Sequence, residues 1–223
     1  MTFSIVARCT RTGQFGMAIA SSSPAVAARC AHVRAGVGAV ASQNVTDPAL
    51  GPLILDRLGE GLSAVQALAA VTTGRAHVDY RQLLVVDKNG EAALHTGAKV
   101  LGLWGEVRGK DCAAGGNLLA SNIVPSVMAA AFESASGHLA ERLLQALEAA
   151  LEAGGEAGTI HSAGLKLADR LSWPLVDLRI DWAPDPIRQL RSAWDVYAPQ
   201  IHAYIQRAED PTQAPSYGVP GDE

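Results

Sequence analysis

Features that usually mark a function class are scarce in this chain of 223 residues. Aromatic residues make up 5% and charged residues 18%, so aliphatic residues and glycine must fill the core. The formal net charge is −4, and the basic residues form no stripe that would follow a phosphate backbone, which argues against nucleic-acid binding. No apolar run is long enough to span a bilayer, which argues against a membrane partner. We expect a globular domain with a large buried fraction.

Cysteine is scarce too. Cys9, Cys30 and Cys112 are an odd number at scattered spacings, without a CxxC pair or a Cys/His cluster. The sequence therefore predicts neither a disulfide framework nor a metal site, and no cofactor is expected. No charged segment followed by an apolar one begins the chain, so we expect a protein of the reducing cytoplasm.

Apolar stretches and turn residues predict the order of elements. Strands are expected at Phe3 to Cys9, Gly16 to Ser22, Gly36 to Gln43, Gln82 to Asp87, Glu91 to His95, Leu101 to Val107, Asp111 to Ala114, Ser162 to Leu167 and Leu175 to Ile180. Helices are expected from Asp47 to about Gly59, from Ala64 to Val71 after a Ser63 cap, from Ile123 to Ser134, from Leu139 to Ala153, and from Asp185 through Tyr197.

Strands in neighbouring pairs and helices in pairs favour antiparallel sheets over a strictly alternating parallel fold. We predict an α+β fold, a four-layer αββα sandwich of two antiparallel sheets flanked by helix pairs. Residues 1–206 are expected to form a single domain, and residues 207–223 a Pro/Gly/acidic tail that is mobile or packed on a neighbouring subunit. The four tryptophans are interpreted as core or subunit-interface residues.

The second residue is the most interesting one chemically. Removal of an initiator Met before a small residue leaves Thr2 with a free α-amine, which titrates near pH ~8. Such an amine can deprotonate the hydroxyl of its own residue, the pairing used by N-terminal threonine nucleophiles. Ser4 lies two residues on, on the same strand face, and would orient the amine or serve as a second nucleophile. Many proteins begin Met-Thr without catalytic reason, so Thr2 alone does not decide the function.

The chain also resembles a known family over about residues 2 to 195. The matching blocks are TFSIVARCTRTGQFGMAIASSSPAVAARC, AGVGAVASQN, DPALGPLILDRLGEGLSAVQAL, VVDKNGEAALHTG, GGNLLAS, HLAERLLQALEA and VDLRID followed by PDPIRQLR. They resemble the bacterial domain of unknown function 1028, which is similar to the N-terminal nucleophile hydrolases. The resemblance implies the αββα fold and hydrolysis of an amide bond through an N-terminal nucleophile.

Roles follow from the matching positions. Thr2 becomes the nucleophile and, through its amine, the base, while the Asn117 amide would help to hold the oxyanion. An Asn after two glycines is as readily a turn or cap residue. Substrate binding is assigned to Ser21, Ser22, Ser23, Gln43, Asn44, His95, Gly116 and Glu156. For His95 a structural hydrogen bond, and for the three serines bonds to loop backbone, are the alternatives.

Two departures from the family pattern keep the substrate open. Gly154-Gly155-Glu156 stands where relatives carry an Asp and then an Arg, and Ser21 to Ser23 replace larger or basic residues. We expect a small-molecule amide substrate and a homodimer or higher homo-oligomer. A non-catalytic binding or assembly protein of the same fold is the alternative. A Cys/His hydrolase using Cys9 or Cys112 has little support, and Gly36-Val37-Gly38 lacks the third glycine of a nucleotide-binding fingerprint.

Overall fold

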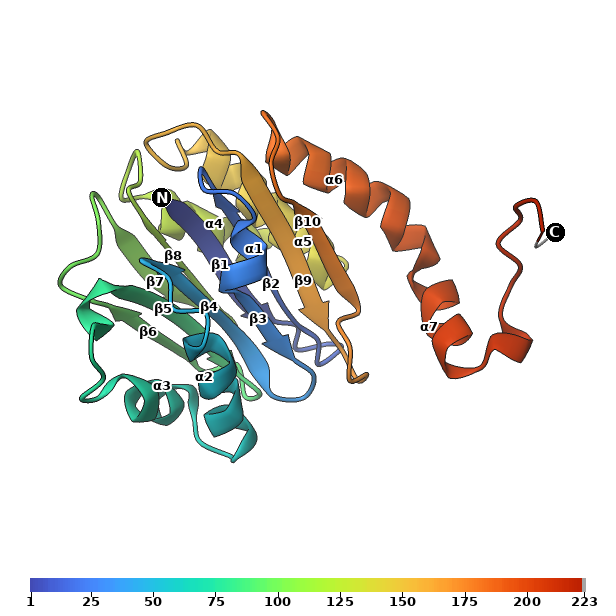
Figure 1. Ribbon diagram of the computed structural model, residues 1–223, viewed down its shortest axis with the longest axis horizontal. Coiled ribbons are helices and arrows are strands. Elements are labelled where there is room, and N and C mark those ends of the chain that lie inside the picture. Colours follow the sequence, from blue (N-terminus) through green and yellow to red (C-terminus); the bar gives the residue numbers. More distant parts are fainter. Residues whose placement is uncertain (222–223) are drawn as a thin grey trace. The chain divides into compact units, whose positions relative to one another are not determined.

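The computed structural model describes residues 1–221, in two compact units, Met1–Leu190 and Arg191 onward. Figure 1 shows two sheets and their helices in the first unit. The segment Thr2–Arg8 forms a strand at the start of the chain. Six of its seven residues are buried, so both faces of this strand are covered, as its nearly continuous apolar sequence predicts. The predicted boundary after residue 206 stays a prediction, since compactness does not decide which segment folds alone.

The larger sheet has six strands in the order β10-β9-β2-β1-β8-β7, all pairs antiparallel. Its strands are β1 (Thr2–Arg8), β2 (Phe15–Ser21), β7 (Gly105–Gly109), β8 (Cys112–Asn117), β9 (Ser162–Ala168) and β10 (Val176–Ile180). The first strand of the chain thus lies in the middle of the sheet, between β2 and β8. Both of its edges are hydrogen-bonded, so its N-terminal residue is held rigidly.

The smaller sheet has the order β3-β4-β5-β6, again antiparallel. Its strands are β3 (Ala31–Arg34), β4 (Gly38–Asn44), β5 (Arg81–Asp87) and β6 (Ala92–Thr96). The inner faces of the two sheets meet in a core of mostly small aliphatic side chains, which suits a chain with few aromatics. Its members include Val6, Met17, Ile19, Ala39, Ala41, Leu84, Val86 and Ala113.

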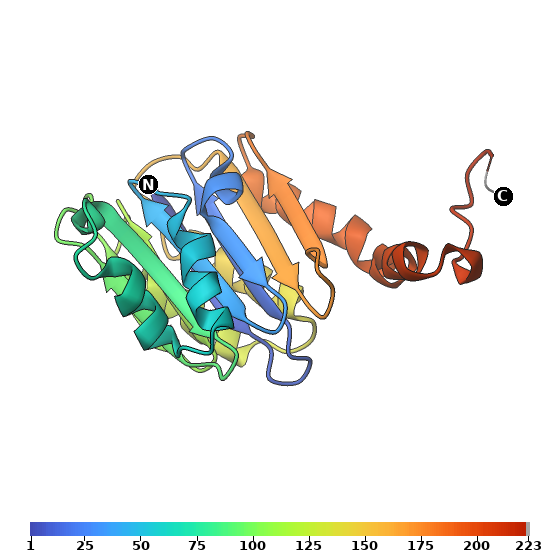
Figure 2. The same ribbon diagram turned by 60° about the horizontal axis from the view of Figure 1, so that its bottom comes forward.

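Helices cover both outer faces. α2 (Leu50–Gly59) and α3 (Ala64–Thr72) pack on the smaller sheet, and α4 (Val124–Ser134) and α5 (Leu139–Glu152) pack on the larger one. Figure 2 shows α2 and α3 in front of the sheets, with the other pair behind. The predicted four-layer αββα sandwich is confirmed.

Local chemistry explains several element ends. Ser63 and Gln66 form the reciprocal capping box that begins α3. Asn89-Gly90 turns β5 into β6 with Gly90 at φ 84°, and Gly13 at φ 78° closes the β1–β2 hairpin, as the sequence predicts. Each turn needs a left-handed residue that glycine adopts without steric cost.

Several elements differ from the sequence prediction. The strand expected at Leu101 to Val107 is β7, which begins at Gly105 and extends to Gly109. The short helix α1 (Val26–Cys30) and strand β3 were not predicted, because a five-residue helix shows no usable periodicity. The predicted strand from Gly36 begins at Gly38 and extends to Asn44. The helix predicted to start at Asp47 begins at Leu50 instead, because the Asp47 carboxylate accepts the Ala49 N–H (3.1 Å) in the preceding turn.

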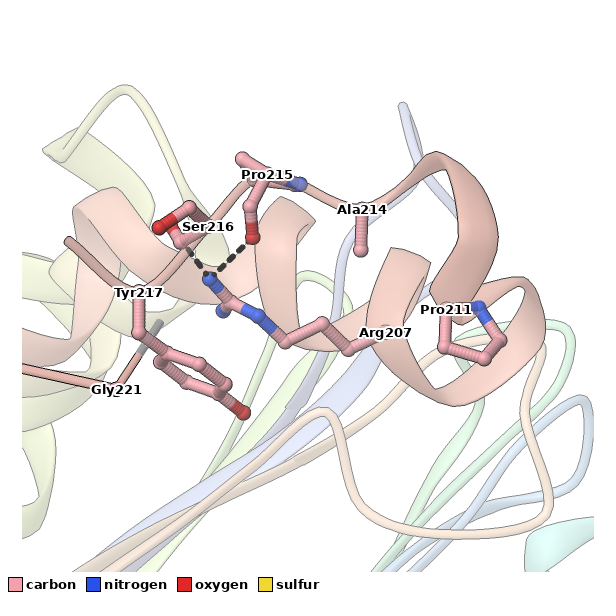
Figure 3. A pocket seen from close by; sticks show the side chains of 7 residues that line it. All are labelled: Arg207, Pro211, Ala214, Pro215, Ser216, Tyr217 and Gly221. Carbon is pink, nitrogen blue, oxygen red and sulfur yellow. Dashed lines mark hydrogen bonds between the residues drawn. The ribbon is translucent and has the colours of Figure 1, made fainter. Parts of the chain in front are cut away.

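α6 (Pro186–Tyr197) agrees with the predicted last helix, but a further helix, α7 (Ile201–Glu209), follows it. Residues after α7 line a cavity of about 720 Å³ with Arg207, shown in Figure 3. The Arg207 guanidinium donates to the carbonyls of Pro215 (2.9 Å) and Ser216 (3.3 Å) and stacks on the Tyr217 ring. This arginine is therefore engaged by its own segment. Among residues 1–221, no helix has the length and apolar character that crossing a bilayer requires.

Candidate active site

Thr2 begins the central strand of the larger sheet and points into the layer between the sheets. Val6, four residues on, belongs to the core between the sheets, and side chains alternate along a strand. Thr2 is 5% exposed, and its strand partner is Asn117 on β8. Its hydroxyl donates to the carbonyl oxygen of Met1, and Oγ1 lies 3.3 Å from Oγ of Ser21. The predicted nucleophile is thus buried beside two polar side chains.

Ser21 contacts the same carbonyl oxygen of Met1 as Thr2 does. The Ser21 hydroxyl also donates to the Met1 carbonyl, and its oxygen accepts the Ser23 N–H (3.1 Å) and lies 2.9 Å from the Ser23 hydroxyl. Two hydroxyl groups therefore converge on one carbonyl oxygen. Converging donors of this kind stabilise negative charge on an acyl oxygen.

Met1 fills the space next to Thr2. A Cβ built on Gly158 would lie 3.0 Å from Met1 Cε and 3.2 Å from its Sδ, so the Met1 side chain rests against a glycine backbone. The α-amine of Met1 is near enough to Glu156 to act on its pKa. While Met1 is attached, the nitrogen of Thr2 is an amide and cannot take a proton. Removal of Met1 would free both the amine and this space.

A buried chain of polar groups lies under Thr2. The Ser4 hydroxyl donates to Gln43 Oε1 (2.7 Å), Gln43 Nε2 donates to Gln82 Oε1 (2.9 Å), and all three residues have no exposed surface. Asn117 Nδ2 donates to the same Gln82 oxygen at 3.2 Å. Gln82 was not among the predicted residues, although a glutamine opening the apolar block QLLVVD is the signal that would have found it.

The network fixes the orientation of the Asn117 amide. Gln82 Nε2 donates to the Gly116 carbonyl (3.2 Å) and to the Thr96 hydroxyl (3.1 Å), so Gln82 Oε1 must face Asn117. Asn117 Nδ2 must then face Gln82, which leaves its second N–H for another acceptor. Asn117 Oδ1 is buried without a hydrogen-bond partner. An unsatisfied buried amide oxygen is costly, and it points to a donor that binds there.

Besides Asn117, Glu156 is a polar side chain of this region with unsatisfied atoms. It is 4% exposed, and although the hydroxyl and backbone N–H of Ser22 approach the carboxylate, neither oxygen has a hydrogen bond of normal geometry. Burial raises the pKa of this carboxyl, while Ser22, the α-amine of Met1 and His161 act to lower it. Backbone bonds from Ala157 to Leu118 (2.9 Å) and from Ala120 to Gly155 (3.1 Å) hold the loop beside the end of β8. Glu156 is therefore fixed near Asn117 and Met1.

Two predicted residues lie elsewhere. His95 pairs with Leu83, whose side chain belongs to the helix-facing core of the smaller sheet, and its Nε2 lies 3.2 Å from the Val78 carbonyl. Asn44 donates to the Tyr80 carbonyl (2.6 Å) and accepts the Leu101 N–H (3.3 Å), so both polar ends support loops. The structure does not bring these two side chains to Thr2. The Gly116 carbonyl accepts a hydrogen bond from Gln82. The Thr2 carbonyl passes so close to Gly116 that a Cβ at this position would lie 3.0 Å from its oxygen.

An aromatic pair lies on the side of Ser21 away from Asn117. The backbone N–H of His161 donates to the Ser21 carbonyl (2.8 Å), and the His161 ring stacks on Trp182 at 4.3 Å between centroids. Trp182 is 60% exposed, so it is not a core residue, and its interpretation as a subunit-interface residue stays a prediction. Within residues 1–221, no group of three or more His, Cys, Asp or Glu side chains is arranged to hold a metal ion.

Two stacked antiparallel sheets lie between two layers of helices, and this arrangement defines the αββα class of fold. The chain belongs to the family of unknown function DUF1028, whose model matches residues 2–190. The crystal structure of protein SPO2555 from Silicibacter pomeroyi, described with the same family model, is similar, with 32% identity and a TM-score of 0.82. The match covers 88% of this chain and 89% of that one.

More distant similarity is found to Anbu, an ancestral beta-subunit. The protein from Yersinia bercovieri is 12% identical with a TM-score of 0.40, over 91% of this chain and 97% of that one. A Gly-1 mutant from Hyphomicrobium sp. strain MC1 is 12% identical with a TM-score of 0.39, over the same shares. The search of curated proteins found no match.

Proposed function

We propose that this protein is an N-terminal-nucleophile amidohydrolase that cleaves a small amide or peptide-like C–N bond through Thr2 after Met1 is removed. The observation that carries the proposal is the Thr2 hydroxyl, buried at the start of the central strand, with Ser21 at 3.3 Å and the Asn117 amide on the facing strand residue. Membership of DUF1028 does not supply an activity, because the family is one of unknown function.

The reaction follows from the groups at this position. The free α-amine of Thr2 takes the proton of Oγ1, and Oγ1 attacks the carbonyl carbon of the amide. The second N–H of Asn117 donates to the oxyanion. The C–N bond then breaks, the leaving nitrogen takes the proton from the α-ammonium, and an ester on Thr2 remains. Water, deprotonated by the same amine, hydrolyses the ester and restores the hydroxyl.

The test compares Met1-free wild type with Thr2→Ala, both confirmed by intact mass, against a panel of small amides. We expect turnover by the wild type and background rates for Thr2→Ala. Thr10→Ala, an exposed threonine at the far end of the same hairpin, serves as the matched control and should keep full activity. Equal turnover by wild type and Thr2→Ala would remove the proposal.

A non-catalytic binding protein is the second candidate. The observation that favours it is the buried Asn117 Oδ1 without a hydrogen-bond partner, because an unsatisfied acceptor marks a place where a ligand can donate whether or not a bond is broken. A native protein that keeps Met1 would have no free base at this site. The expected homo-oligomer stays a prediction, which light scattering of the full chain measures.

A further inference from the structure

The Glu156 carboxylate lacks a partner that the site should supply. Its two oxygens are buried, and although the hydroxyl and backbone N–H of Ser22 approach them, neither oxygen accepts a hydrogen bond of normal geometry, whereas a carboxylate offers about four acceptor positions. A buried carboxylate whose oxygens are left unsatisfied is among the most costly arrangements in a protein, and a bound cation would relieve it. Because Glu156 lies near Thr2, we expect this cation to be a charged group of the ligand that binds at Thr2.

Met1 shows which kind of group fits the site. Its carbonyl oxygen accepts from the Thr2 and Ser21 hydroxyls, its α-amine acts on Glu156, and its side chain rests against Gly158. These three parts, a carbonyl, an α-ammonium group and a side chain, together make an α-aminoacyl group. Each part already has its own neighbour in the protein.

The acyl group of a substrate would occupy nearly the same space. Met1 is joined to the nitrogen of Thr2, and a substrate acyl group would be joined to Oγ1 of the same residue. Nitrogen and Oγ1 of one threonine are close enough for an acyl group to move from one to the other. The neighbours of Met1 are therefore the neighbours of an acyl group on the nucleophile.

We propose that the site takes amides of α-amino acids, with Glu156 receiving the substrate ammonium group and Gly158 leaving room for the side chain. This inference rests on the proposed function for its catalytic part, but its binding part can be measured alone. Glu156 is a specificity residue here, and it takes no part in bond breaking. The unsatisfied buried oxygens of Glu156 and the contact of the Met1 side chain with Gly158, two residues on, are the two independent observations.

Binding is measured on the Met1-free Thr2→Ala protein, which cannot turn over its ligand. Calorimetry compares methionine amide with its desamino analogue, 4-(methylthio)butanamide, and with N-acetylmethionine amide. We expect methionine amide to bind about 10-fold or more tightly than either neutral compound, the effect of a hydrogen-bonded charge pair. Adding Glu156→Gln should abolish this preference, whereas Glu152→Gln, an exposed charge at the end of α5, should leave it unchanged.

Gly158→Ala supplies an arm that does not alter charge. Its added methyl group would meet the end of the Met1 side chain, so it should weaken methionine amide binding and spare glycinamide. Thermal melting of each variant shows whether it is folded. Loss of the preference for methionine amide through misfolding is thereby separated from loss of the Glu156 charge.

The outcomes separate the two proposals. Equal binding of methionine amide and its desamino analogue, or a preference that survives Glu156→Gln, would overturn the inference. A Glu156→Gln effect equal for charged and neutral amides would also overturn it, because Glu156 would then hold the α-amine of Thr2 itself. Thr2-dependent hydrolysis of neutral amides without ammonium preference would keep the hydrolase and reject the aminoacyl site. Ammonium-selective binding without any turnover would do the reverse.

Discussion

Thr2 and Asn117 face each other as partners in the β1–β8 ladder, so their side chains enter the layer between the sheets together. They are 115 positions apart in sequence (117 − 2), and the antiparallel register alone unites them. Both side chains are almost fully buried, and one N–H of the Asn117 amide is held by Gln82. A nucleophile and an oxyanion donor need this fixed relationship.

Replacing Asn117 tests the oxyanion role. Asn117→Ala should lower kcat about 10²-fold or more with little change in KM, because the amide acts on charge that develops only in the transition state. Steady-state kinetics on the best amide measures this. Asn122→Ala, an exposed asparagine five residues on, is the matched control. A rise in KM with unchanged kcat would assign Asn117 to substrate binding instead.

Gln82 is expected to position Asn117. Gln82→Leu removes the acceptor of Asn117 Nδ2 and the donor to the Gly116 carbonyl, and it leaves the Gln43 amide with the more distant Gly115 carbonyl (3.4 Å) as its acceptor. Buried groups left unpaired cost about 1–3 kcal/mol each, so the free energy of unfolding should fall by several kcal/mol. Urea unfolding measures the loss. If kcat of the folded fraction is unchanged, Gln82 supports the fold alone.

An N-terminal extension should abolish activity. A tag before Thr2 keeps its nitrogen in a peptide bond and fills the space that Met1 occupies beside Gly158. The same tag at the C-terminus should leave turnover intact. Protein with a protease-cleavable N-terminal tag gives the sharpest comparison, since activity should appear when cleavage exposes Thr2. Full activity before cleavage would contradict the role of the amine as base.

Glu156 should make stability depend on pH. Burial raises its pKa in the folded protein above the ordinary value of 4.5, so the folded chain holds its proton to higher pH than the unfolded chain. The stability linked to that proton is fully present below pH 4.5 and is lost as pH rises through the folded pKa. The Tm of Glu156→Gln minus that of wild type should therefore increase with pH. Differential scanning calorimetry across this range measures it, with Glu152→Gln as the control, and a flat difference would show that the carboxyl is not desolvated.

The sequence could predict the layers of the fold because strong local signals marked most elements. The Asn89-Gly90 turn, the Ser63 cap and the paired helices all agree with the structure. Helix α1 and strand β3 were not predicted, because segments of five and four residues are too short to show a hydrophobic period. Local signals also cannot show that α7 follows α6 after a short turn.

The site was predictable only in part. Thr2, Ser4, Ser21, Gln43 and Asn117 are joined by hydrogen bonds and strand pairing, and the loop with Glu156 lies beside the end of β8, whereas His95 and Asn44 bond to other loops. Strand register decides which face a residue takes, and a shift of one position reverses it, so His95 could not be placed from its block alone. Gln82 and Gly158 gain importance only from contacts with residues distant in sequence.

The most direct test of the account is covalent labelling of the Met1-free protein with an activated ester of methionine, followed by intact mass and peptide mapping. We expect one ester-linked acyl group, released by hydroxylamine, on Thr2 of the wild type, and no hydroxylamine-labile acyl group on that peptide in Thr2→Ala or in protein that keeps an N-terminal tag. A hydroxylamine-labile acyl group at another residue with none on Thr2, or equal hydroxylamine-labile labelling of Thr2→Ala, would contradict the role of Thr2 as nucleophile.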